Sequence, residues 1–427
     1  MTPEVKQRIE QIRQGIVPEG YKKTKSDIVP VDWKESSIGE YICEYTEKTT
    51  IPNQYPVLTS ARTGLMLQTK YYSNRQVTTE NNVGYNILPF GYVTFRSRSD
   101  DGRFRFNENR IIKRGIISYF YPVFSFSEEV CHEYMLYLLN FSIYRRMYSY
   151  AEGTAQQVLS LKKLGQLKYS LPPVREQKKI AEILSTQDKA IELQGRKIEE
   201  LKRFKQGCLE RMFPRKGRKV PEKRFPGFTD DWEQRKVSDV ADICTGGTPS
   251  TSIQRYWFPK EIPWLSSGEV HKKYITFTDN EISIEGMNNS SARIISENSV
   301  LIALAGQGKT RGTVAINRIP LTTNQSIASM TFCKQVVPEF VFCNLESRYD
   351  EIRRMSSGDG SRGGLNKQIV GDIEIPYTST DEQRLIGTFF ESLDHLITLH
   401  QRKLEEMKRQ KKALMQLLLT GIVRVKA

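Results

Sequence analysis

Two long stretches of the chain carry apolar residues at alternating spacings of three and four positions. The first runs from about Arg175 to Phe213 and the second from about Asp381 to Thr420. This spacing is typical of a coiled-coil seam, and it predicts two helices of about 39 residues, each roughly 58 Å long at ~1.5 Å per residue. The expected seam residues are Leu184, Ile191, Gln194, Ile198 and Leu201 in the first helix, and Phe390, Ile397, His400, Leu404 and Met407 in the second.

Polar residues occupy matching seam positions of the two helices. Gln194 corresponds to His400, and Lys205 corresponds to Lys411. Polar residues in a seam lower stability but fix register and partner choice. We therefore interpret His400 as a register residue rather than as a metal ligand or a general base. The alternative is two unrelated helices, each packed on its own domain.

Each long helix follows a mixed region of shorter elements. Strands are expected at 91–98 and 116–126, where polar and apolar residues alternate, and helices at 128–148 and 339–355. Thr380, with Gln383 three residues later, predicts a capping box at the start of the second long helix.

The chain contains an internal repeat. The segment RKIEELKRFK, from Arg196, matches RKLEEMKRQK, from Arg402, which lies 206 positions later. Asp32-Trp33 matches Asp231-Trp232 near the start of each half, and Gly91 aligns near Asn298. A repeated sequence of this length predicts one structural unit of about 206 residues that is present twice.

Charge narrows the class of partner. Lys and Arg number 64 against 49 Asp and Glu, which gives a formal net charge of +15 and a pI near 9.4. Such an excess favours a polyanion because each neutralised phosphate releases counterions, although a ribosomal or membrane-surface protein would also carry it.

Two similar modules on a spacer longer than one turn of B-DNA, ~34–36 Å, suit two half-sites on one duplex.

Other compositional features exclude several classes of protein. No apolar run approaches the ~20 residues that span a bilayer, and the N-terminus lacks the apolar core of a signal peptide, so we expect a cytoplasmic protein without a membrane partner. The cysteines form no CxxC pair, which predicts reduced core thiols rather than a zinc site. They are Cys43, Cys131, Cys208, Cys244, Cys333 and Cys343.

We find no motif for catalysis. The segment AGQGKTRG, from Ala305, resembles a phosphate-binding loop, but the required earlier glycine is replaced by Ala303. An adenine methyltransferase needs a donor-binding loop and an Asn/Asp-Pro-Pro-aromatic motif, whereas the one Pro-Pro pair follows Leu171 and opens a helix. Clustered carboxylates for a nuclease are also missing. We predict no catalytic residue and no metal ligand in this chain.

Basic, amide and hydroxyl residues on irregular segments are the candidates for DNA contact, because Arg pairs with guanine, Gln with adenine, and hydroxyls and Lys with phosphate. In the first half they are Arg62, Arg96, Arg98, Arg103, Arg105 and Gln156, and in the second half Ser266, Ser267, Lys309, Thr310, Arg311 and Arg362. Solvated loop charge is the alternative for each single residue.

The chain resembles the specificity subunits of Type I restriction–modification systems. The second half carries GGTPS at Gly246–Ser250, then Tyr256-Trp257, IPWLSSGEV from Ile262, and Asn324-Gln325. Both halves enter the long helix through a proline followed by Glu-Gln, at Glu176-Gln177 and Glu382-Gln383. The first half lacks the GTPS and Tyr-Trp elements, which makes it the weaker match.

The resemblance implies an α+β fold in which two similar mixed α/β target-recognition domains are joined by two long antiparallel coiled-coil spacer helices with an internal pseudo-two-fold repeat. The expected parts are an N-terminal helical segment at 1–20, a first recognition domain at 21–165, a central spacer helix region at 166–222, a second recognition domain at 223–370 and a distal spacer helix region at 371–427.

The resemblance also implies a function and partners. Each recognition domain would read one half of a bipartite double-stranded DNA target. Two methyltransferase subunits and two restriction/translocase subunits would assemble with the chain, and the methyl donor, ATP and magnesium would bind those subunits rather than this one. The alternatives are a recognition subunit of another restriction–methylation system and a stand-alone DNA-binding regulator.

Overall fold

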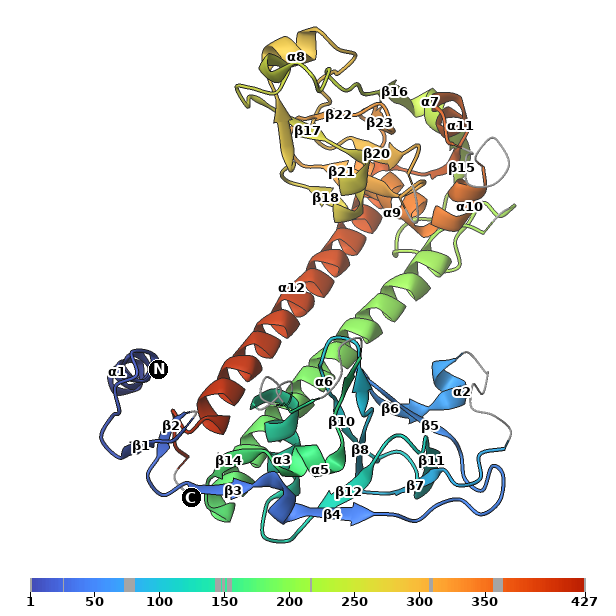
Figure 1. Cartoon of the computed structure of the whole chain (residues 1–427). Helices are drawn as coiled ribbons and strands as arrows, with labels where there is room; N and C mark the ends of the chain where they lie inside the picture. The colour runs from blue at the N-terminus through green and yellow to red at the C-terminus, as the bar shows by residue number, and fades with distance from the viewer. Residues whose placement is uncertain are drawn as a thin grey trace. The chain divides into compact units, whose positions relative to one another are not determined.

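The structure, a computed structural model, describes residues 2–25, 27–72, 81–142, 147, 150–151, 156–215, 217–306, 310–355 and 364–425. The chain divides into two compact units. The first unit comprises residues 1–193 and 404–427, and the second comprises residues 194–403. The long helices are α6 (Val174–Met212) and α12 (Thr380–Leu419), each within one residue of its predicted bounds. Helix α6 begins in the first unit and ends in the second, whereas α12 begins in the second and ends in the first (Figure 1).

Before α6, the first unit consists of short elements. They are α1 (Pro3–Arg13), β1 (Tyr21–Lys23), β2 (Ile28–Pro30), β3 (Lys34–Ser37), η1 (Ile38–Tyr41), β4 (Ile42–Tyr45), β5 (Leu58–Ala61), β6 (Gly64–Leu67), α2 (Gln68–Tyr71), β7 (Asn86–Pro89), β8 (Val93–Phe95), β9 (Arg98–Ser99), β10 (Phe106–Glu108), β11 (Arg114–Ile117), β12 (Val123–Phe126), α3 (His132–Tyr137), the π-helix η2 (Leu138–Ser142), β13 (Gln157–Val158), α5 (Leu161–Gly165) and β14 (Lys168–Leu171).

Between α6 and α12, the second unit has a comparable series. It comprises β15 (Glu233–Lys236), α7 (Val237–Val240), β16 (Ala241–Thr245), η3 (Gln254–Tyr256), β17 (Ile262–Leu265), η4 (Ser267–Lys272), β18 (Tyr274–Ile275), β19 (Asn280–Ile282), α8 (Ile284–Asn288), β20 (Val300–Ala303), β21 (Val314–Asn317), β22 (Thr322–Thr323), β23 (Ile327–Phe332), α9 (Pro338–Ser347), α10 (Tyr349–Arg354), α11 (Lys367–Gly371) and β24 (Glu374–Tyr377).

Each unit contains a sheet in which four strands follow the same order. In the first unit the strand order is β10-β8-β12-β4, and in the second it is β21-β20-β23-β16 with β18 added beside β21. The four shared strands pair antiparallel in both units. A second antiparallel pair, β3 with β14 and β15 with β24, precedes each long helix. The predicted repeat and α+β class are therefore confirmed, and the first half shares the sheet despite lacking two of the motifs.

Some of the predicted elements differ from the structure. The helix expected at 128–148 is limited to α3 and η2 in the described residues, and the helix expected at 339–355 is interrupted at Arg348. The strand expected at 91–98 divides into β8 and the start of β9. Cys43 and Cys333 are exposed, so the prediction of core thiols was wrong for these two, whereas Cys131, Cys208 and Cys343 are buried.

The predicted capping box at Thr380 is also wrong, because the helix begins at that residue. The Thr380 hydroxyl donates to the carbonyl of Gln335 instead, and the Gln383 amide donates to the carbonyl of Thr378 while accepting from the backbone N–H of Val337. The polar side chains therefore attach the start of α12 to the segment that leads into α9.

The two long helices pair antiparallel within each unit. In the second unit Gln194 donates to the His400 carbonyl at 2.8 Å, and Lys205 Nζ lies 2.6 Å from Asp394. In the first unit Lys411 bonds Asp188. The seam residues Leu184, Gln194, Ile198, Leu201, Phe390 and Ile397 are buried, and Ile191, His400, Leu404 and Met407 are half-buried. Each seam lysine thus meets an aspartate, Asp394 or Asp188, at equivalent positions of the repeat.

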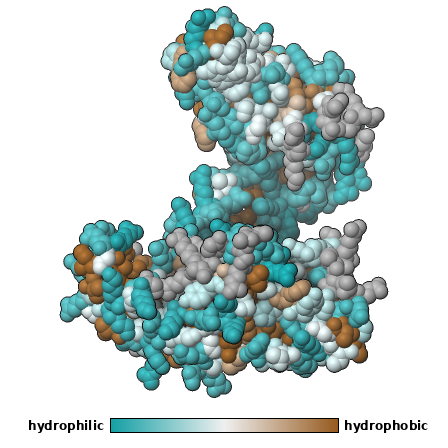
Figure 2. All heavy atoms as spheres, in the orientation of Figure 1, coloured by the Kyte–Doolittle hydropathy of each residue, from teal (hydrophilic) through white to brown (hydrophobic). Residues whose placement is uncertain are grey.

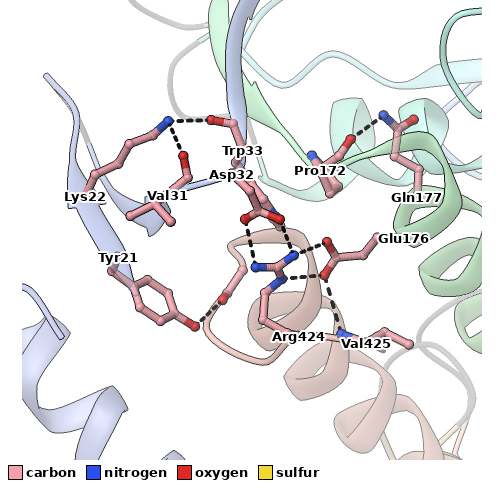
Figure 3. A network of polar contacts seen from close by, with 11 residues as sticks. Tyr21, Lys22, Val31, Asp32, Trp33, Pro172, Glu176, Gln177, Arg424 and Val425 are labelled. Carbon is pink, nitrogen blue, oxygen red and sulfur yellow. Dashed lines mark hydrogen bonds and ion pairs between the residues drawn. The ribbon is translucent and has the colours of Figure 1, made fainter. Parts of the chain in front are cut away.

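A partly buried ion-pair network joins the segment that follows α12 to the start of α6 in the first unit (Figure 3). The Arg424 guanidinium bonds both carboxylate oxygens of Glu176 at 2.8 Å and both of Asp32 at 2.8 Å. The Lys22 ammonium donates to the carbonyls of Val31 and Trp33. Arg424 and Val425 therefore attach the segment that follows α12 to the first unit.

The glycine that follows α12 provides a test of this packing. Gly421 has a φ of +74°, and a Cβ there would lie 2.6 Å from Pro30 Cδ and 3.0 Å from Trp33 Cζ2. We expect Gly421→Ala to lower the free energy of unfolding by about 2–4 kcal/mol, because it combines left-handed backbone strain with overpacking. Urea denaturation measures the change.

Gly15→Ala is the matched control. Gly15 has a φ of +75°, and a Cβ there would meet no described atom within 4 Å. This variant should therefore show the backbone cost alone, about 1–2 kcal/mol. Equal losses in the two variants would contradict the close packing of Gly421 on Pro30 and Trp33.

Candidate nucleic-acid interface

An arginine-rich segment links β8 to β10 in the first unit. Exposed and buried side chains alternate along it, as expected of extended chain with one face on the core. Ser97, Ser99, Phe104 and Phe106 are buried, and Arg96, Arg98, Arg103 and Arg105 are exposed. Phe106 packs on Phe95, with the ring centroids 4.7 Å apart. The core contacts of the phenylalanines thereby hold the arginines on the outer face.

The four arginines line one hollow of about 360 Å³ together with Arg62, which lies in the turn between β5 and β6. All five arginines predicted in the first half therefore gather at one place, although they come from two separate stretches of chain. Asp100 and the tyrosines Tyr71, Tyr72 and Tyr121 also line the hollow. A concave surface with a positive lining has the electrostatic character that a nucleic acid requires.

Asp101 organises two of these arginines. Arg62 Nη2 lies 2.7 Å from Asp101 Oδ1, and Arg103 Nε lies 3.9 Å from Asp101 Oδ2. Partial desolvation opposes ionisation of Asp101, but hydrogen bonds from the Ser99 hydroxyl and the Arg103 backbone, with the Arg62 charge, outweigh it and lower its pKa. Asp101 is therefore a carboxylate at neutral pH. It accepts hydrogen bonds from the Arg62 guanidinium and from the backbone N–H of Arg103, and it forms a longer ion pair with the Arg103 guanidinium.

Two further contacts order the edge of the hollow. The Arg98 guanidinium lies 4.6 Å from the centre of the Phe120 ring, a distance typical of a cation–π contact. Gln156 Nε2 donates to Asp100 Oδ1 at 2.8 Å. Because β13 pairs with β9 through Val158 and Arg98, the structure brings Gln156 beside the arginine segment.

Sequence reasoning missed three participants in this site. Asp101 was not selected because only basic, amide and hydroxyl residues were taken as candidates for DNA contact. Tyr71 and Tyr72 are 47% and 39% exposed and lie in the lining, where aromatic faces can stack on unpaired bases. The adjacent pair Tyr71-Tyr72 was the feature of the sequence that could have indicated this contact.

The corresponding connection of the second unit joins β20 to β21. Thr310 and Arg311 lie in it, as predicted from the alignment of Gly91 with Asn298. Gly91 and Asn298 both have a positive φ. Lys309, in this same connection, and Arg362 lie outside the described residues. Arg96, Arg98, Arg103 and Arg105 in the first unit and Thr310 and Arg311 in the second thus occupy equivalent connections, β8–β10 and β20–β21.

Backbone hydrogen bonds gather several loops at this end of the second unit. Asn324 N–H donates to the Leu265 carbonyl, and Leu304 N–H donates to the Ser326 carbonyl. A Cβ on Gly246 would lie 2.0 Å from the Thr323 carbonyl oxygen, so only glycine fits there. The Thr248 hydroxyl donates to Gln325 Oε1 at 2.6 Å, and both residues are exposed. The GGTPS and Asn-Gln motifs therefore form one surface.

Ser266 and Ser267 lie at the start of η4, next to this surface. Ser266 has a structural role, because its hydroxyl and its backbone N–H both donate to Glu269 and complete a capping box. Desolvation opposes the charge of Glu269, but Lys272 and the backbone N–H groups of Asp279 and Ser266 outweigh it and lower the pKa of Glu269. Contact of Ser266 and Ser267 with DNA stays a prediction.

The face of the molecule that Figure 2 shows is mainly hydrophilic. Within the described ranges, no group of three or more His, Cys, Asp or Glu residues is arranged to hold a metal ion. No helix in the same ranges is both long enough and apolar enough to cross a membrane. The arginine-lined hollow of the first unit is suited to binding a polyanion.

Comparison with protein families matches residues 30–203 and 229–409 to the model of the Type I restriction modification DNA specificity domain. The chain belongs to this family. The two matched stretches are the two halves of the repeat, and each includes one sheet and most of one long helix. Recognition of a DNA target is the function of Type I specificity subunits, and it is the function of this specificity chain.

Individual relatives agree with this assignment. The specificity chain is 24% identical to the Type I restriction enzyme MjaVIII specificity subunit of Methanocaldococcus jannaschii, over 97% of this chain and 98% of that one. It is 26% identical to the putative MjaX specificity subunit of the same organism, over 69% and 68% of the two chains. The crystal structure of a Type I S subunit from M. genitalium shares the fold, with a TM-score of 0.58, 15% identity and coverage of 96% and 100%.

Proposed function

We propose that this chain selects a bipartite double-stranded DNA target, that each unit reads one half-site, and that the paired helices set the gap between half-sites. The observation that carries the proposal is the equivalence of the connections β8–β10 and β20–β21. They occupy equivalent places in two sheets with the same strand order. The first connection presents Arg96, Arg98, Arg103 and Arg105, whereas the second presents Thr310 and Arg311. Similar frames with different side chains suit two different half-sites.

In this proposal the chain has no catalytic role. Two methyltransferase subunits and two restriction/translocase subunits assemble on it, and these partners bind the methyl donor, ATP and magnesium. The absence of a methyl-donor loop and of a base-holding motif from the sequence supports this division of labour. The target thus depends on this chain, and the chemistry depends on its partners.

Exchange of one recognition domain tests the modular reading. We expect replacement of residues 21–164 by the equivalent domain of another family member to change the first half-site and to leave the second half-site and the gap unaltered. The physical reason is that the arginine-lined hollow lies wholly within this segment. The measurement is a genome-wide map of methylated bases in cells that produce the chimaera with the methyltransferase subunits.

The same experiment contains its controls. Exchange of residues 223–370 should change only the second half-site. A chimaera that alters both half-sites would contradict the modular reading. Cells that produce the chain without methyltransferase subunits should show no methylation of the target, and methylation in those cells would contradict the non-catalytic role.

A further inference from the structure

The Arg62–Asp101–Arg103 cluster has more order than phosphate contact requires. The three side chains are 65%, 41% and 73% exposed, so they are accessible at the rim of the hollow. Exposed arginines normally lose considerable side-chain entropy on binding. Asp101 reduces that loss because it already bonds the Arg62 guanidinium and the backbone N–H of Arg103, whose guanidinium lies within ion-pair distance.

The donors left by these contacts suit a base edge. A guanidinium has five N–H donors. Among the described residues, Arg62 bonds a side-chain acceptor through Nη2 only, and Arg103 faces Asp101 through Nε. Arg103 thus retains a terminal edge with two parallel N–H groups, from Nη1 and Nη2, and this edge matches the O6 and N7 acceptors of guanine in the major groove. Arg62 retains donors on Nη1 and Nε.

The carboxylates argue against a phosphate as the ligand of this cluster. Asp100 and Asp101 are both exposed beside the arginines, and a negative charge at the rim repels the DNA backbone. Arginine donors match the guanine of a G·C pair, because O6 and N7 of guanine both accept hydrogen bonds, whereas an adenine edge offers a donor and an acceptor instead.

We propose that Asp101 positions Arg62 and Arg103 to recognise a G·C base pair, so that the half-site read by the first unit contains guanine. This proposal rests on the proposed function and adds the base identity and the positioning residue. Arg103 contacts guanine O6 and N7 through its terminal edge, Arg62 adds one donor to O6, and Asp101 acts by orienting both arginines.

Maps of methylated sequences test the proposal with the assembled enzyme. The chain is produced with its methyltransferase subunits, either unchanged or as Arg62→Lys, Arg103→Lys or Asp101→Asn. Lysine retains the charge but lacks the rigid planar fork of parallel N–H donors that aligns with a guanine edge. We expect each variant to lose about ten- to hundredfold of its discrimination at one G·C position of the first half-site, while the second half-site and the gap stay the same.

Arg110→Lys is the matched control. Arg110 belongs to the same unit, is 60% exposed and pairs with Glu108 at 2.6 Å, but it does not line the hollow. This variant should keep the full target. Asp101→Glu retains the carboxylate and should restore part of the discrimination that Asp101→Asn loses, which a purely structural role of Asp101 would not predict.

The outcomes separate this proposal from the function on which it rests. A first half-site without any G·C pair, or three variants that retain full discrimination at every position, would overturn the guanine proposal and leave the specificity role intact. A chain that directs methylation to no bipartite target at all would overturn the proposed function. Degeneracy confined to one G·C position supports both.

Discussion

Replacing Arg224 with alanine is expected to lower the free energy of unfolding of the second unit by about 3–5 kcal/mol. The Arg224 guanidinium bonds both carboxylate oxygens of Glu382, at 2.6 and 2.8 Å, and Glu382 is fully buried. Trp232 Nε1 donates to the same carboxylate at 3.0 Å. Removal of the guanidinium leaves a buried carboxylate without its counter-charge, and such a group is far more costly than the loss of an exposed ion pair. Hydrogen exchange of amides in the second unit measures the change.

Arg424→Ala is the matched comparison. Arg424 holds the equivalent place in the first unit, where it bonds Glu176, but it is 36% exposed and shares its charge with Asp32. Water can replace part of its hydrogen bonding, so a smaller loss of about 1–3 kcal/mol is expected. The double variant Arg224→Met/Glu382→Leu removes both charges and should regain most of the stability. A loss below 1 kcal/mol in Arg224→Ala would contradict the account of a buried ion pair.

A matched insertion in both long helices is expected to lengthen the gap between half-sites by about two base pairs. Four residues add ~6 Å to a helix, and base pairs are ~3.4 Å apart. Placed between Gln194 and Gly195 in α6 and between Leu399 and His400 in α12, the insertions keep three antiparallel contacts. These are Gln194–His400, Lys205–Asp394 and Asp188–Lys411. A map of methylated sequences reads the gap directly.

Insertion into α6 alone is the control. It displaces one side of the seam against the other, so Lys205 and Asp188 cannot both meet their partners. The added turn also rotates the distal part of the helix by about 40° beyond a full turn and produces a stutter in the heptad. We expect weaker methylation from this variant. An unchanged gap in the matched variant would show that the helices do not set the distance.

The elements that the sequence predicts best are those with a long local period. The ends of α6 and α12 were predicted to within one residue because seam positions recur over about 39 residues and prolines precede each helix. The repeat was found because the sequence matches across 206 positions. The shorter elements were harder: the helix expected at 339–355 divides at Arg348, whose guanidinium donates to the Glu374 carbonyl, and nothing local announces that contact.

The candidate interface likewise combines features that the sequence predicts with features that depend on the fold. The sequence showed the cluster of arginines from Arg96 to Arg105 and predicted a strand only as far as Arg98. The addition of Arg62 to the same hollow depends on the fold, because Arg62 and Asp101 are 39 positions apart. The role of Asp101 appears only when both arginines are seen beside it.

By itself the sequence determined the repeat, the two long helices, their polar seam positions and the DNA-specificity family. Each of these depends on periodicity or on similarity between stretches of the same chain. Only the tertiary structure decided which charges meet. Glu176 meets Arg424 and Glu382 meets Arg224 across 248 and 158 positions, and each seam lysine meets an aspartate. Pairings of this kind have no periodic signature, because folding brings the partners together and burial then makes the pairing of their charges decisive for stability.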